Sequence, residues 1–330
     1  MEAIFRSVFD FIHSFVDNYG VSVILFTVFI RFIQMPFDYK SRQSMRKMEK
    51  INPKIQALQK KYANDQEKLQ KKQAELYRKE KINPLSGCLP MLITLPIMFI
   101  MLGVLRHVAD EQLVKALLSV QRAVGDLGIQ DADAISAALP SKESLMYPFL
   151  WIKNLWMPDS PFSTILPTNS SVLATVRNGI EGLITPEGIA SLQAFVDGEI
   201  YQNIIVPSYD LSVLKGANIN LLIINWQVYM QPNGYLVLPI LSFVTQVLSS
   251  QIMTKQQKAS GQTQNQAGGG MMKWGMPIIF AIFCVSYTAS FALYLVVSGV
   301  LQVAQTQFFN WYLNAQDKKA AALTEEVDKL

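Results

Sequence analysis

The chain has 330 residues, half of them hydrophobic and only 16% charged, with a formal net charge of +4 and a mean hydropathy of +0.21. Soluble domains carry about a quarter charged residues, so this composition excludes an ordinary soluble globular protein and indicates a membrane protein with sizeable polar parts. Cys88 and Cys284 both fall inside apolar runs and only two histidines are present, so neither a disulfide framework nor a histidine-rich metal site is expected.

Residues 1–20 are predicted to form an amphipathic helix on the outer membrane surface. Apolar side chains recur there at helical spacing, namely Ile4, Phe5, Val8, Phe11, Ile12, Phe15 and Val16. An ordinary helix packed against the rest of the protein is the alternative. No removable signal peptide is expected, because a basic region followed by an apolar core and a small-residue cleavage site is not evident.

Five apolar segments are predicted to span the membrane as helices. They are residues 21–39, 86–106, 235–254, 274–289 and 290–311. The last two form one apolar stretch from Trp274 to Phe309, which is too long for a single helix that crosses a core of about 30 Å. We therefore expect a helical hairpin that turns near residues 286–290.

The charge of the connecting segments predicts how these helices are oriented. Residues 38–84 hold 14 Lys and Arg against 6 Asp and Glu, and residues 255–273 hold 3 against none. Residues 106–232 hold 7 against 12. Because Lys and Arg are enriched in cytoplasmic loops, the basic segments are predicted to be cytoplasmic and the acidic one to lie outside. The N-terminus is then outside and the C-terminus in the cytoplasm.

Residues 40–85 are predicted to form a basic cytoplasmic hairpin of two antiparallel helices. Apolar residues such as Met48, Ile51 and Ile55 recur at helical spacing, and Asn64 or Asp65 is a candidate N-cap of the second helix. The pairs Glu67/Lys71 and Glu75/Lys79 have the i,i+4 spacing that supports a helix. The excess positive charge has three compatible interpretations: a solvated face, attraction to anionic lipid headgroups, or contact with a ribosome or an acidic targeting partner. No motif for specific base readout is present.

The outer insertion, residues 107–234, is expected to be a small α or α+β domain. Its first half has a helical pattern around Leu113 and Leu117, whereas residues 204–206 and 221–224 are candidate strands. Its acidic residues are scattered and form no catalytic constellation, so the protein is not expected to be an enzyme. Residues 255–273 are predicted to be a flexible cytoplasmic loop, and residues 312–330 a cytoplasmic tail.

Arg31 is the most informative residue, because it lies in the otherwise uncharged apolar run 21–37. An arginine at the centre of a spanning helix costs roughly 2.5–3.5 kcal/mol on insertion scales, so it is expected to face water or a partner; snorkelling to an interface is the alternative. Thr27 and Gln34 lie on the same helical face. The other spans supply further polar candidates, namely Thr94, Thr245, Gln246, Ser249, Ser298 and Gln302. Such residues also bond neighbouring helices without any further role.

Several stretches together resemble one protein family. They are residues 18–36 with Arg31, residues 52–62 of the hairpin, residues 83–97 with Pro90 and Pro96, the outer motif 149–159, residues 238–245, and Met276-Pro277. In order and spacing they resemble the YidC/Oxa/Alb family of membrane protein insertases. The chain departs from the family at Thr94, where glutamine is common, at the turn 287–290, and at Leu295, where tryptophan is expected.

The resemblance implies an all-α polytopic membrane protein of bacterial YidC type in the cell membrane. Its five-transmembrane-helix insertase core would enclose a hydrophilic groove that receives the polar or acidic tail of a nascent membrane protein and releases its helix into the bilayer, alone or with a Sec-type translocon. The implied groove residues are Arg31, Thr27, Gln34, Thr94, Thr245, Gln246, Ser298 and Gln302. No cofactor is implied. The implied partners are nascent membrane proteins and the lipid bilayer, with the ribosome, a targeting receptor and the translocon as candidates for the basic loops.

Two other functions remain open at the level of sequence. A secondary transporter or anion channel would use Arg31 as its binding charge, although transporters often contain paired repeats and none is visible here. A scaffold or assembly chaperone for other membrane proteins would share most features with an insertase.

Overall fold

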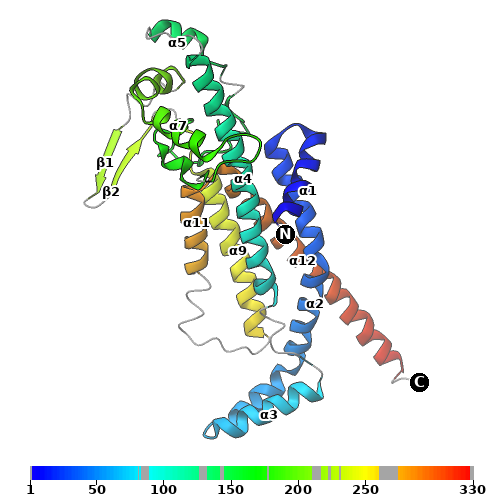
Figure 1. The fold of residues 1–330 in the computed structure, drawn as a ribbon. Coiled ribbons are helices and arrows are strands. Elements are labelled where there is room, and N and C mark those ends of the chain that lie inside the picture. Colours follow the sequence, from blue (N-terminus) through cyan, green and yellow to red (C-terminus); the bar gives the residue numbers. More distant parts are fainter. Residues whose placement is uncertain are drawn as a thin grey trace. The chain divides into compact units, whose positions relative to one another are not determined.

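The structure, a computed structural model, consists mainly of long helices (Figure 1). It describes residues 2–80, 82, 89–125, 132–141, 145–176, 178–209, 217–221, 224–229, 232–259 and 274–327. Three helices in this part of the chain are long and apolar enough to cross a membrane, namely Tyr19–Lys61, Val237–Gln256 and Ala289–Lys319, and Met276–Ser286 is a shorter apolar helix. These helices agree with the predicted all-α membrane protein.

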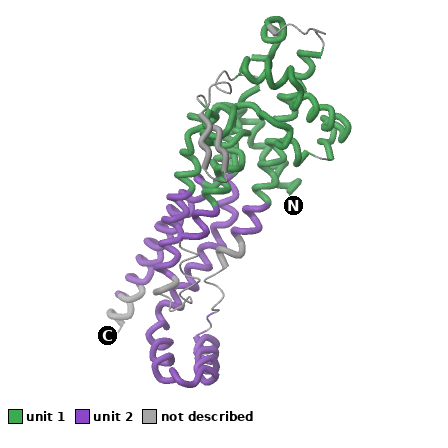
Figure 2. The backbone as a smooth tube through the Cα atoms, turned by 90° about the vertical axis from the view of Figure 1, so that its left-hand side faces the viewer, with its two compact units in different colours: residues 1–26, 100–242, 280–295 green, residues 27–99, 243–279, 296–330 purple. Residues whose placement is uncertain are grey.

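The chain divides into two compact units, which Figure 2 distinguishes by colour. Unit 1 comprises residues 1–26, 100–242 and 280–295, and unit 2 comprises residues 27–99, 243–279 and 296–330. Each unit is therefore assembled from three separate stretches of sequence. The polar residues predicted for the groove all belong to unit 2.

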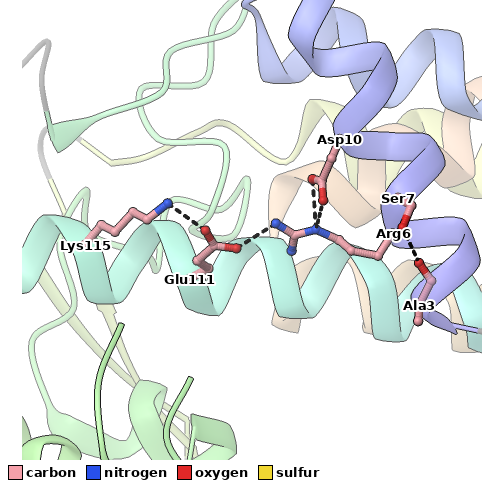
Figure 3. A network of polar contacts seen from close by, with 6 residues as sticks. All are labelled: Ala3, Arg6, Ser7, Asp10, Glu111 and Lys115. Carbon is pink, nitrogen blue, oxygen red and sulfur yellow. Dashed lines mark hydrogen bonds and ion pairs between the residues drawn. The ribbon is translucent and has the colours of Figure 1, made fainter. Parts of the chain in front are cut away.

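In unit 1, helix α1 (Glu2–Val16) packs against helix α4 (Leu89–Gly125) through an ion-pair network (Figure 3). The Arg6 guanidinium binds Asp10 at 2.9 Å and Glu111 at 2.6 Å, and Lys115 binds the other oxygen of Glu111 at 2.6 Å. Phe9 is fully buried. This face of α1 is therefore packed against the protein, as in the alternative prediction. Two other apolar side chains of α1, Phe11 and Phe15, are exposed.

Helix α4 continues beyond the predicted span into residues 107–125 of the predicted insertion and supplies part of its core. The buried core includes Leu113, Leu117 and Val120 of α4 with Ile189 and Leu192 of a later helix. The other helical elements here are α5 (Ala132–Ala138), η2 (Ser170–Val176), α7 (Pro186–Val196), η3 (Tyr201–Ile205) and α8 (Val206–Tyr209). The helical pattern predicted for the first half of the insertion is therefore present.

The strand predicted at residues 204–206 is wrong. Ile205 closes the π-helical η3 and Val206 begins α8, and both are buried. The physical reason is tertiary: the buried Tyr201 donates its hydroxyl to the Pro167 carbonyl at 3.0 Å, which fixes a helical face against the core despite the β-branched side chains. The insertion does contain one hairpin, in which β1 (Ala217–Leu221) pairs antiparallel with β2 (Ile224–Val228). Of the predicted strand 221–224, residues 222 and 223 lie outside the described residues.

The outer motif 149–159, here called the clasp, joins separate segments of unit 1. Asp159 is fully buried and accepts hydrogen bonds from the backbone of Tyr235 at 2.8 Å and of Leu238 at 2.7 Å, at the start of helix α9 (Val237–Ala259). The backbone of Ser290, in helix α12 (Ala289–Val327), donates to the Leu155 carbonyl at 3.0 Å. The clasp therefore satisfies backbone groups at helix N-termini, which lack partners within the helix.

Helix α2 (Tyr19–Lys61), whose residues 27–61 belong to unit 2, runs without a break through Pro36 and Pro53. The first helix of the predicted hairpin is thus the continuation of the first span. The second is α3 (Gln66–Lys79), whose N-cap is Asp65, and the two helices share a core of Met48, Ile51, Ile55 and Ile82.

One predicted ion pair of the hairpin is present and one is wrong. Lys71 binds Glu67 at 2.7 Å as expected, but Glu75 binds Lys72 at 2.7 Å and not Lys79. Both spacings bring side chains to one helical face, so the i,i+3 partner is an equally available choice for Glu75.

Two of the three remaining helices extend further than their predicted spans, and one is shorter. α9 continues to Ala259, and residues 260–273 of the predicted loop lie outside the described residues. α11 (Met276–Ser286) ends two residues before α12 begins, within the interval where a turn was predicted. α12 then continues to Val327, so most of the predicted tail is helical.

Candidate functional site

Arg31 lies on α2 within unit 2 and is 8% exposed. Its guanidinium is held by two neutral side chains of α12. Nη2 and Nε donate to the Ser298 hydroxyl at 2.5 and 3.1 Å, and Nη2 also donates to the Gln302 amide oxygen at 3.2 Å. These three residues, predicted from different parts of the sequence, are therefore in direct contact.

Thr27 and Gln34 are buried on the helical face of α2 that carries Arg31, at 0% and 5% exposure. Both positions are one turn from Arg31, as the helical spacing predicts. The face of α2 that meets α12 is thus polar over at least two turns, within a segment that is otherwise apolar.

Thr245 of α9 lies at a close contact between α9 and α12. Thr245 and Ser249 are buried, one turn apart. A Cβ atom at Gly299 would lie 2.7 Å from the Thr245 hydroxyl oxygen, so the two helices approach closely next to Ser298. Small residues permit such approach between helices in a membrane.

Two predicted residues are placed less specifically. Thr94 is half-buried in α4, and Gln246 is half-buried in α9.

The structure adds residues that the sequence reasoning missed. Asp38, Arg42 and Arg46 continue the polar face of α2. Asp38 lies seven residues after Arg31, and each of the two arginines lies four residues after the residue before it in this series. Asp38 lies within electrostatic reach of both Arg31 and Arg42. We call this face of α2, with the side chains of α9 and α12 that it binds, the polar ladder.

The lower part of the polar ladder is held by further hydrogen bonds to α9 and α12. Arg42 donates to the Gln256 amide oxygen at 3.2 Å and to the Thr306 hydroxyl. Arg46 binds Asp317 at 2.5 Å and also donates to Asn314. The signal that would have found them is the spacing itself, since charged residues at these intervals share a helical face.

The chemistry of the polar ladder favours reversible binding of anions or polar chains. Guanidinium groups form strong charge-assisted hydrogen bonds with carboxylates and phosphates, and the hydroxyl and amide groups that now accept from Arg31 and Arg42 are neutral and weaker partners. Among the described residues, no group of three or more His, Cys, Asp or Glu is placed to hold a metal ion.

The chain is similar to bacterial membrane proteins over almost its full length. Residues 11–317 match the family described as 60Kd inner membrane protein. A protein named membrane protein insertase YidC from Clostridium perfringens is 26% identical over 321 residues, which cover 92% of this chain and 87% of that protein.

Other relatives align over shorter stretches, with higher sequence identity. The proteins of the same name from Fusobacterium nucleatum and Francisella tularensis subsp. novicida are 47% identical over 92 residues and 51% identical over 90 residues, covering 28% and 27% of this chain. These alignments span 45% and 16% of the two relatives. The match over residues 11–317 includes every residue of the polar ladder, and the apolar helices agree with an inner membrane location. The chain therefore belongs to the 60Kd inner membrane protein family, which includes relatives named membrane protein insertase YidC.

Proposed function

We propose that this chain is a membrane protein insertase in which Arg31 receives the polar or acidic tail of a nascent membrane protein. The observation that carries the proposal is the buried Arg31 guanidinium, bound to Ser298 and Gln302 within apolar helices. A buried charge is costly without compensation, and an incoming carboxylate is a stronger partner than a hydroxyl or an amide.

The proposed mechanism needs no covalent step and no cofactor. The tail enters a hydrophilic groove of a five-helix core from the cytoplasm, and Arg31 with nearby hydroxyls and amides replaces part of its hydration. An inside-negative potential then favours outward movement of each acidic residue by about 2.3 kcal/mol per 100 mV. The apolar substrate helix moves into the bilayer along the third and fifth spans.

We further propose which side chains line this groove. They are Thr27, Gln34, Thr94, Thr245, Gln246, Ser298 and Gln302, together with Arg31. The contacts of Arg31 with Ser298 and Gln302, and the burial of Thr27, Gln34 and Thr245, support this lining.

Insertion into proteoliposomes that contain only the purified chain tests the proposal. Two single-span substrates that differ only in an acidic or a neutral tail are compared for protease protection. Arg31→Ala is expected to reduce insertion of the acidic-tailed substrate about tenfold, the equivalent of one charge-assisted hydrogen bond, while Arg31→Lys largely preserves it. Arg122→Ala, which removes an exposed arginine, serves as the control.

Two results would contradict the proposal in different ways. Equal insertion by wild type and Arg31→Ala would remove Arg31 from the mechanism. Anion flux through the same vesicles without any insertion would favour the alternative, a secondary transporter or anion channel that uses Arg31 as its binding charge.

We also propose that the N-terminus lies outside and the C-terminus in the cytoplasm, as the segment charges favour. In this orientation the hairpin of α2 and α3 is cytoplasmic, and it is the proposed contact for a ribosome, a targeting receptor or a Sec-type translocon. The exposed lysines Lys68, Lys71 and Lys72 on α3 support an electrostatic contact of this kind.

A further inference from the structure

A polar cavity of about 290 Å³ lies between α2, α9 and α12 at the end of the polar ladder. Its lining includes Arg42, Arg46, Glu49, Lys255, Gln256 and Asn310. All of these residues belong to unit 2. The cavity is not one of the positions predicted for the groove, and the mechanism proposed above makes no use of it.

The lining has more positive than negative charge. Arg46 is bound to Asp317, but the Arg42 guanidinium donates to the neutral side chains of Gln256 and Thr306. The Nε atom of Arg42 is buried and has no hydrogen-bond partner among the described residues. None of the ion pairs in the described part of the chain includes Lys255. The cavity therefore offers two cations to an anionic ligand.

Aromatic side chains beside the cavity indicate its depth in the membrane. On α12, Trp311 directly follows the lining residue Asn310 and is 64% exposed, and Phe308 and Tyr312 are also exposed. The ring of Tyr39 on α2 packs against Phe309 at 5.5 Å. Exposed aromatic belts lie at the level of lipid headgroups, so the cavity is at headgroup level with an apolar surface next to it.

We propose that this cavity binds the phosphate headgroup of an anionic membrane lipid. Arg42 and Lys255 face the phosphate oxygens, Gln256 and Asn310 are available to headgroup hydroxyls, and the acyl chains lie along the exposed aromatic side chains. Guanidinium groups match phosphate geometry, and basic pockets between spanning helices on the cytoplasmic side suit such headgroups. The inference goes beyond the proposed function and rests on the membrane location of the chain and on its proposed orientation.

Native mass spectrometry of the full chain, exchanged from mixed micelles of phosphatidylglycerol and phosphatidylcholine, tests the site. Wild type is expected to retain one phosphatidylglycerol in preference to phosphatidylcholine. Lys255→Gln and Arg42→Gln are each expected to weaken retention about fivefold, the effect of one cation near an anionic headgroup. Glu49→Gln is expected to strengthen retention, because it removes a negative charge from the lining.

The matched control removes two exposed lysines elsewhere in unit 2, Lys68→Gln with Lys71→Gln. Equal weakening in this control would mean diffuse attraction and overturn the site. Binding of inorganic phosphate as tightly as phosphatidylglycerol, or of an acidic peptide in its place, would overturn the lipid assignment. Because Lys255 is exposed, its variant is expected to keep the wild-type circular dichroism spectrum, which separates lost binding from lost folding.

Discussion

Asp38 lies between two arginines on one face of α2, seven residues after Arg31 and four before Arg42, and within electrostatic reach of both. If Arg31 receives acidic tails, the Asp38 carboxylate competes with the substrate for the same positive potential. Asp38 is therefore expected to set how strongly the site prefers acidic substrates over neutral ones.

Asp38→Asn is expected to raise insertion of the acidic-tailed substrate, relative to the neutral-tailed one, by about two- to fivefold. The reason is the loss of a competing charge worth about 1 kcal/mol in this partly buried setting. The ratio of the two yields in proteoliposomes is the measurement, and Glu67→Gln on the exposed hairpin is the control. An equal change for both tails would show that Asp38 acts on folding or general activity.

Gly234 is a second position where the addition of a single atom is expected to change the stability of the protein. A Cβ atom there would overlap the carboxylate oxygen of Asp159 that accepts from the Tyr235 backbone. Gly234→Ala is expected to lower the thermal unfolding midpoint in detergent by about 1–4 °C, since overpacking costs about 1–3 kcal/mol. Gly125→Ala, where a Cβ atom would meet nothing within 4 Å, is the matched control. Equal midpoints for wild type and Gly234→Ala would mean that the clasp tolerates this shift.

At the scale of elements, the contact between α1 and α4 depends on ionised Glu111. Burial raises the pKa of Glu111, but hydrogen bonds from Lys115 and Arg6 outweigh burial and hold the pKa below its ordinary value. The unfolded chain therefore takes up this proton more readily than the folded chain. The stabilisation is complete above the unfolded pKa of about 4.3 and is lost as the pH falls through the lower folded value.

Glu111→Gln is expected to destabilise the chain by about 1–2 kcal/mol at neutral pH, the value of hydrogen bonds to a charged group. The difference from wild type should shrink as the pH falls below about 4 and through the folded pKa of Glu111, where the wild-type carboxylate also loses its charge. The measurement is the unfolding midpoint of wild type and of Glu111→Gln across this pH range. Glu199→Gln, which changes an exposed glutamate, is the control. A gap that stays constant with pH would exclude the ion pair as its cause.

The helices and their polar faces were predictable from local spacing, but their partners were not. Thr27 and Gln34 follow from Arg31 by helical geometry alone, and Asp38 would have followed by the same argument. Ser298 and Gln302 are more than 260 positions away, so their contact with Arg31 depends on how α2 and α12 pack. The strand predicted at 204–206 failed for the same reason, because the core around Tyr201 overrides β propensity.

At the scale of the whole molecule, motifs that are far apart in sequence meet in unit 1. The clasp at 149–159 binds the start of α9 through Asp159 and the start of α12 through Leu155. The order of these motifs identified the family from the sequence, whereas the hydrogen bonds explain physically why they occur together. The clasp thus joins helices of unit 1, whereas the candidate substrate site is formed by other residues, in unit 2.

Every proposed functional role depends on the orientation of the chain, which is a prediction from the charge of its segments. Residues 38–84 hold 14 basic residues against 6 acidic ones, and residues 106–232 hold 7 against 12. Moving the basic hairpin outward is disfavoured, so α3 is expected in the cytoplasm and α7 outside. Ala74 of α3 and Ala190 of α7 are both exposed, which makes them a matched pair for labelling.

In intact cells, Ala190→Cys is expected to react with a membrane-impermeant maleimide that has access only to the outer face of the inner membrane. Ala74→Cys is expected to react only after that membrane is permeabilised. The wild-type chain, which carries Cys88 and the buried Cys284, is measured in parallel, and its labelling is subtracted as background. The reverse pattern would invert the topology: the basic hairpin would lie outside, where no ribosome is present, and acidic tails could not reach Arg31 from the side on which they are synthesised.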